Sequence, residues 1–393
     1  MMSLVSRREL LAAVSPRYHR STKKEKHSIL REFIQNTGYH PKCALILLNH
    51  PPAAKRPTKR RRPRKYPASL RKTLVQLWRC ANGICGKRLV PFLPELIRVL
   101  ERHHEIAITP EAKALLLQMS PATCDRLLRH ERQTNPKPRG LSTTKPGTLL
   151  KNQIPVRVFT AWDEAVPGFL EVDLVAHCGR AVSGEYLHTL VLTDIKTTWT
   201  ECVALLNRSQ KTVSAAIAQV RTVLPFSLLG LDSDNGPEFI NANLLRYCTQ
   251  EHVTFTRSRP YKKNDQAHVE QKNWTHVRHF TGYDRYEGPR ALKVLANLYK
   301  SLVLYMNYFQ PTLKLVSKQR IDGHVRKQYD TAQTPYRRVL ACPEISEDYK
   351  EAARLCYETL NPFTLLAQMK RFQQQLWVLE TVRFPIEATL PTE

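Results

Sequence analysis

Three acidic residues, Asp173, Asp234 and Glu270, have the types and spacing best suited to chemistry on a phosphodiester. Asp173 lies in the apolar run GFLEVDLVAHC, where a buried carboxylate is costly unless it is paired or holds a cation. Asp234 directly precedes a turn-forming Asn-Gly-Pro sequence, and 35 residues separate it from Glu270. Such hard oxygen ligands suit two Mg²⁺ ions, for which Mn²⁺ can substitute. Two such ions would stabilise the attacking and leaving oxygens of an in-line displacement at phosphorus.

Two further aspartates compete with this trio. Asp232 precedes Asp234 by two residues, so on a strand both would lie on the same face, and Asp232 is an alternative ligand. The Asp-Asn-Gly turn favours Asp234. Asp194, in VLTDIKT, also ends a predicted strand, and we expect it to close that strand into a turn without a catalytic role.

Basic and aromatic side chains surround Glu270 in the sequence. Lys262 and Lys263 precede the helix predicted to carry Glu270, in a loop that a DNA phosphate could approach, and Lys272 lies within that helix. We predict DNA contacts for all three lysines. Trp274 is more often a core anchor than a base-stacking platform, because large aromatics near a sheet usually pack.

Alternating strands and helices are predicted to position the carboxylates. Three short runs rich in β-branched residues come first and suit neighbouring strands. A helix, a strand, a helix, a strand and the helix of Glu270 follow. This order indicates an α/β ribonuclease-H-like domain, which we assign to residues 156–310.

Three sequence motifs now support a resemblance. EVDLVAH around Asp173, DSDNGPEF around Asp234 and NDQAHVEQKNW around Glu270 resemble the DDE transposase and integrase superfamily that includes retroviral integrases, and the 35-residue gap is also usual there. The helical front end, YMNYFQP and YDTAQTPYRR are similar to bacterial insertion-sequence transposases of the ISNCY-like group. The resemblance implies metal-dependent nicking of the element's ends, then attack of the freed 3′-hydroxyl on target DNA.

The charge distribution indicates a polyanionic partner. The chain of 393 residues has a formal net charge of +27, and residues 1–65 contribute 17 basic minus 3 acidic residues, or +14. Eight of the eleven residues from Lys55 to Lys65 are basic. We interpret residues 53–66 as a linker that follows DNA phosphates. Its predicted DNA-binding residues are Lys59, Arg60, Arg61, Arg62, Arg64 and Lys65.

Two all-α units are predicted before the α/β domain. Residues 1–52 suit a helix-turn-helix, with a turn near Gly38 and a second helix from about Pro41. Residues 67–132 form a second helical unit, where Ser120 and Pro121 suit a helix start, and residues 133–155 form a linker. A zinc site built from Cys80, Cys85, His103 and His104 is an alternative, but adjacent histidines on a helix cannot both face one ion, so buried thiols are the default expectation.

The remaining predictions concern the tail and the partners. Residues 311–393 are predicted to be mainly helical and to make dimer contacts, so we expect a homo-oligomer on double-stranded DNA, namely the element's inverted-repeat ends and the target. No run of 18 apolar residues occurs, so we expect a cytoplasmic, nucleoid-associated bacterial protein. No Walker-type loop occurs either, and any ATPase must be a partner. A catalytically silent DNA-binding regulator and a ribonuclease-H-like nuclease are the competing hypotheses.

Overall fold

The computed structural model describes residues 2–51, 65–133, 166–234, 236, 238–258, 267–321 and 324–381. The chain divides into two compact units, Met1–Lys65 and Tyr66–Glu393. Most of the basic linker and nearly all of the linker predicted at 133–155 lie outside the described residues. Among the residues that are described, no helix combines the length and the apolar character needed to cross a membrane.

The first unit contains three helices around a small apolar core. Thr22 and Glu25 form a reciprocal capping box at the start of the second helix, and Gly38, at φ +70°, ends that helix in the left-handed conformation. The predicted turn at Gly38 and the helix start at Pro41 are therefore confirmed. The helices are α1 (Leu4–Arg20), α2 (Lys23–Thr37) and α3 (Pro41–Asn49), and the core residues are Leu11, Tyr18, Ile29, Phe33, Ala44 and Leu48.

A five-stranded mixed sheet forms the centre of the second unit, in the order β3-β2-β1-β4-β5. The strand β1 pairs antiparallel with β2 and parallel with β4, while β2 pairs antiparallel with β3, and β4 pairs parallel with β5. Three strands followed by alternating helices and strands agree with the predicted α/β order. The strands are β1 (Phe169–Ala176), β2 (His188–Asp194), β3 (Thr200–Leu205), β4 (Gly230–Ser233) and β5 (Thr254–Arg257).

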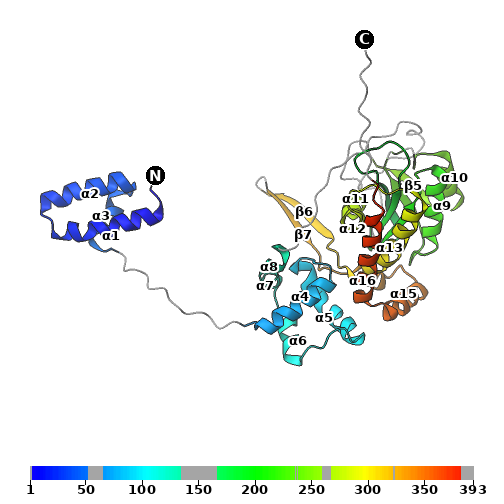
Figure 1. Ribbon diagram of the computed structural model, residues 1–393, viewed down its shortest axis with the longest axis horizontal. Coiled ribbons are helices and arrows are strands. Elements are labelled where there is room, and N and C mark those ends of the chain that lie inside the picture. The colour runs from blue at the N-terminus through cyan, green and yellow to red at the C-terminus, as the bar shows by residue number, and fades with distance from the viewer. Residues whose placement is uncertain are drawn as a thin grey trace, which may run out of the picture. The chain divides into compact units, whose positions relative to one another are not determined.

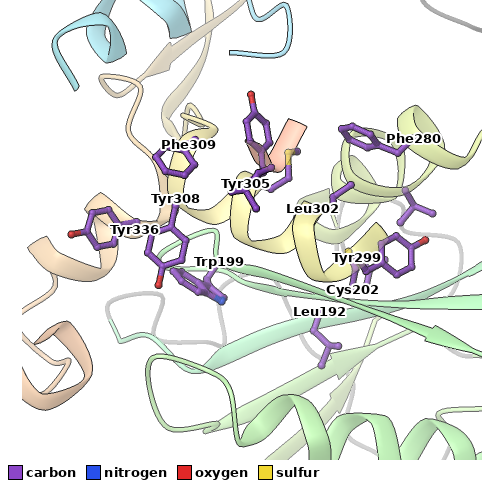
Figure 2. Packing of buried hydrophobic residues seen from close by; sticks show 14 of the residues in the cluster. Leu192, Trp199, Cys202, Phe280, Tyr299, Leu302, Tyr305, Tyr308, Phe309 and Tyr336 are labelled. Carbon is purple, nitrogen blue, oxygen red and sulfur yellow. The ribbon is translucent and has the colours of Figure 1, made fainter. Parts of the chain in front are cut away.

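Helices cover both faces of this sheet (Figure 1). On one face, Tyr299 of α13 lies beside Cys202 of β3 and Tyr308 packs edge-on against Trp199, whereas Leu192 of β2 points to the opposite side (Figure 2). The opposite face is covered by α9 and α10, whose buried aliphatic side chains complete the core. The helices are α9 (Gln210–Arg221), α10 (Ala242–Gln250), α11 (Ala267–Lys272), the π-helical turn η2 (Asn273–Arg278), α12 (His279–Thr281) and α13 (Gly288–Phe309).

Glu201 of β3 gives this core a pH-dependent stability. Burial raises the pKa of its carboxyl from 4.5 to about 7, although Trp199 Nε1 donates a hydrogen bond of 2.8 Å to Glu201 Oε1. The folded chain therefore holds a proton that the unfolded chain has released. The stability from this group is complete below pH 4.5 and is lost as the pH rises through about 7.

We therefore expect Glu201→Gln to be more stable than the wild type at pH 8 by about 1–2 kcal/mol, and similar to it below pH 4.5. The glutamine keeps an oxygen for Trp199 but has no charge to bury. Urea denaturation at both pH values measures the difference, and Glu347→Gln, at an exposed position of the C-terminal region, is the control. An equal difference at the two pH values would contradict the assignment.

The helices that precede the sheet pack on the C-terminal part of the same unit. Tyr305 of α13 donates a 2.7 Å hydrogen bond to the Cys80 carbonyl, and Arg337 forms a 2.8 Å ion pair with Glu95. The prediction separated residues 67–132 from the α/β domain, whereas the structure joins them in one hydrophobic core. The helices are α4 (Ala68–Cys80), α5 (Gly86–Arg102), α6 (Pro110–Leu117), α7 (Pro121–Leu127) and α8 (Arg129–Gln133).

The C-terminal region is helical as predicted, except for one hairpin. Strands β6 (Leu315–Ile321) and β7 (His324–Tyr329) form a separate two-stranded antiparallel sheet that the sequence analysis missed. An Asp-Gly dipeptide lies between them in the sequence and is a strong hairpin signal, but the strands lack the apolar alternation of a half-buried sheet. The helices that follow are α14 (Pro335–Ala341), α15 (Glu347–Thr359) and α16 (Pro362–Val378).

Candidate functional site

The parallel pairing of β1 with β4 brings two of the predicted site residues together. The register pairs Val172 with Ser233, so Asp173 and Asp234 are the next residues on adjacent strands. Neighbouring strands are about 4.8 Å apart, and side chains at paired positions of a parallel pair point to the same face. Asp173 and Asp234, which are 61 residues apart in the sequence, therefore lie side by side at the carboxyl end of β4.

The carboxyl group of Asp173 has a raised pKa, so it keeps its proton to a higher pH than an ordinary aspartate. Burial raises its pKa from 3.8 to about 7, and the negative charges of Asp234 and Glu270 add to this rise. Its two oxygens accept hydrogen bonds from the Leu174 backbone N–H at 2.8 Å and from Asn273 Nδ2 at 2.6 Å, both of which oppose the rise. The charges of Asp234 and Glu270 both act on Asp173, so each of these two carboxylates lies within electrostatic range of Asp173.

The turn after β4 fixes the position of Asp234. Its Oδ1 accepts a 2.9 Å hydrogen bond from the backbone N–H of Gly236, and burial raises its pKa. A Cβ atom at Gly236 would lie 2.9 Å from Asp234 Oδ1 and 2.7 Å from the Glu238 side chain, so a larger residue there would displace both carboxylates. Glu238, which the sequence analysis did not select, is also partly buried, and the charge of Asp234 helps to raise its pKa.

The helix that carries Glu270 is attached to β1 at both of its ends. At its start, Glu171 Oε2 accepts hydrogen bonds from the backbone N–H groups of His268 and Val269, at 2.9 and 3.0 Å. This carboxylate lies at the positive end of α11. At the other end, Asn273 donates its hydrogen bond to Asp173 from the first residue of η2, and π-helical turns within helices often accompany functional sites. Glu270 is exposed between these two attachments.

The two competing aspartates have structural contacts. Asp232 is fully buried beside Glu171 in the sheet and accepts a 2.6 Å hydrogen bond from Thr256 Oγ1. Asp232 therefore lies inside the sheet, whereas Asp234 follows the end of β4, and this difference supports the choice of Asp234. Asp194 accepts hydrogen bonds from the Gly168 N–H and from the Thr197 N–H and hydroxyl, so it closes the strand into a turn, as predicted.

Two predictions about the neighbours of Glu270 are wrong. Lys272 is 6% exposed and points inward, and burial together with the charge of Arg88 lowers its pKa to about 7. A buried lysine cannot reach a DNA phosphate. Trp274, predicted as a core anchor, is 40% exposed and contacts the ring of His279. The π-helical turn changes the helical phase after Lys272, and the sequence does not reveal that change.

Most other predicted DNA contacts fall outside the described residues. Lys65 is described and is exposed. The contacts that remain predictions without a structural description are Lys59, Arg60, Arg61, Arg62, Arg64, Lys262 and Lys263.

The three carboxylates fit a divalent cation by their chemistry. Asp173, Asp234 and Glu270 offer only oxygen donors, as Mg²⁺ prefers, and a cation would offset both the burial and the neighbouring negative charges that raise the pKa of Asp173. Within the part of the chain that the structure describes, no three acidic, histidine or cysteine side chains already converge closely enough to hold an ion. Glu270, the exposed member, is the carboxylate that would have to approach the other two.

The fold and the site define an α/β protein with a mixed five-stranded sheet, flanking helical regions and an acidic cluster at one end of the sheet. The chain belongs to the same family as the uncharacterized protein y4rM of Sinorhizobium fredii (strain NBRC 101917 / NGR234). The two are 41% identical over 344 residues, which cover 87% of this chain and 97% of y4rM. No family model matches the sequence.

Solved structures similar to this chain include two retroviral domains. The HTLV-2 integrase catalytic core domain in complex with magnesium is 16% identical, with a TM-score of 0.29, over 37% of this chain and 91% of that domain. The catalytic core domain of BIV integrase is 18% identical, with a TM-score of 0.29, over 48% of this chain and 98% of that domain.

Proposed function

We propose that this protein is a DNA transposase or integrase that cuts the ends of a DNA element and joins the freed 3′-hydroxyl to target DNA. One observation carries the proposal. Asp173, Asp234 and Glu270, which the sequence motifs single out, interact electrostatically at one end of the sheet. A buried carboxyl whose pKa is raised further by two neighbouring carboxylates suits a site for divalent cations.

Each residue of the site has a distinct role in this proposal. Asp173, Asp234 and Glu270 would hold Mg²⁺, and Asn273 orients Asp173 through its 2.6 Å hydrogen bond. Glu171 holds the first turn of the helix that presents Glu270. When bound, the ions stabilise the attacking and leaving oxygens at phosphorus. The helices of residues 1–52 and the basic linker would recognise double-stranded DNA, and a homo-oligomer would hold two element ends together.

The test is an assay with the purified full-length protein and labelled linear duplexes that end in the DNA flanking its coding region. With Mg²⁺ we expect nicks at the element ends and products joined to a target plasmid, and with EDTA neither product. Cutting without joining would identify a nuclease and contradict strand transfer. Specific end binding without cutting would identify a silent regulator and contradict the catalytic proposal.

A further inference from the structure

The hairpin β6–β7 extends from the second unit as a ribbon of two strands (Figure 1). A two-stranded hairpin is marginally stable by itself and has two unpaired edges, so a protein that carries one usually protects or uses it. At about 3.3 Å per residue, the seven residues of β6 extend about 23 Å. The ribbon is thus about twice as long as the DNA major groove is wide, which is about 12 Å.

The base of the hairpin is fixed to the catalytic sheet. Lys314 donates hydrogen bonds from Nζ to the carbonyls of Ile195 and Lys196, both at 2.9 Å, in the turn that follows β2. Asp330 accepts a 2.7 Å bond from the Lys314 backbone N–H and forms a 2.7 Å ion pair with Arg338 of α14. These contacts attach the base of the ribbon to the end of the sheet opposite Asp234.

The charge of the hairpin is almost entirely positive. Between Leu315 and Tyr329 the sequence contains four Lys or Arg residues and one Asp, a formal charge of +3. The backbone register pairs position 318 of β6 with Lys327 of β7. Arg326 and Lys327 are exposed. Charged side chains can also protect an edge strand from pairing with another chain, but charges of either sign serve that purpose.

We propose that the hairpin β6–β7 is a DNA-binding arm that inserts into a groove of duplex DNA away from the carboxylates. The proposal deepens the function proposed above and rests on it, because DNA must be the substrate. A two-stranded ribbon fits the major groove, and basic side chains on it neutralise the phosphates on either side. Because the hairpin is anchored at the far end of the sheet, it would strengthen DNA binding and position the DNA. The three carboxylates would carry out the reaction.

The test measures binding of the full-length protein to a labelled random-sequence duplex at a series of KCl concentrations. Each phosphate contact contributes about 0.9 to the slope of log K against log salt. We expect Arg326→Ala with Lys327→Ala to reduce that slope by about 1.8. The matched control, Lys370→Ala with Arg371→Ala, removes two exposed charges from α16 and should leave the slope unchanged.

The outcomes separate the arm from the proposed function. If the wild type binds DNA with a steep salt dependence and both double variants keep its slope, the hairpin is not a DNA-binding arm, while the proposed function stands. If the wild type does not bind duplex DNA, both proposals fail. If the hairpin variant keeps the slope but changes the sedimentation coefficient, the hairpin contacts a second copy, and the DNA assignment is overturned. Should the alanine pair lower the melting temperature, Arg326→Gln with Lys327→Gln must give the same loss of slope.

Discussion

Asp173→Asn is expected to abolish strand transfer with Mg²⁺, at least about a thousandfold below the wild type, while end binding is retained. The amide is nearly isosteric, and its single oxygen can accept one of the two hydrogen bonds that Leu174 and Asn273 donate to separate oxygens of Asp173. It removes the negative charge that the proposed cations require. Asp234→Asn and Glu270→Gln should cause losses of the same order, because removing any one carboxylate leaves the metal site incomplete.

The matched control is Asp348→Asn, which makes the same chemical change at an exposed position of α15. Joining assays and DNA-binding titrations on all four variants test the prediction, and melting temperatures show whether each variant is folded. A variant at Asp173, Asp234 or Glu270 that joins DNA at more than a tenth of the wild-type rate would exclude that residue from the trio. Loss of DNA binding together with joining would indicate a folding defect instead.

Arg285→Ala is expected to lower the free energy of unfolding by about 3–5 kcal/mol. Arg285 is 2% exposed, and its guanidinium donates to four backbone carbonyls of the loop between β1 and β2 and forms an ion pair with Glu287. Alanine would remove the Arg285 donors from those four buried carbonyls and the positive charge from beside Glu287. The four carbonyls belong to Cys178, Ala181, Ser183 and Glu185.

Two controls define the origin of this loss. Arg285→Lys keeps the positive charge but not the planar array of donors, so we expect it to recover less than half of the stability. Arg290→Ala, at an exposed position near the start of α13, should change stability by no more than about 0.5 kcal/mol. Urea denaturation of the three variants provides the comparison. A loss below about 1 kcal/mol for Arg285→Ala would show that other contacts hold the loop.

The candidate site could be predicted from the sequence because its members occur in distinctive local contexts. Asp173 interrupts an apolar strand, Asp234 precedes a turn, and Glu270 lies within a helix at a fixed separation. The supporting residues could not be predicted. Glu171 caps a helix that begins 96 residues later in the chain, and Arg285 bonds to a loop about 100 residues before it. Such contacts depend on which strands become neighbours, and a single sequence does not specify strand pairing.

The sequence by itself determined the local features of this protein: the turn at Gly38, the helix start at Pro41 and the order of strands and helices along the chain, and it selected the three candidate carboxylates. Helix propensity, capping and hydrophobic periodicity depend on residues that are close in the sequence, so they can be predicted from the sequence. Only the tertiary structure decided that β1 lies beside β4, that Lys272 is buried and that β6–β7 forms a basic ribbon. Burial and strand register result from packing between distant segments, and that packing overrides the local pattern.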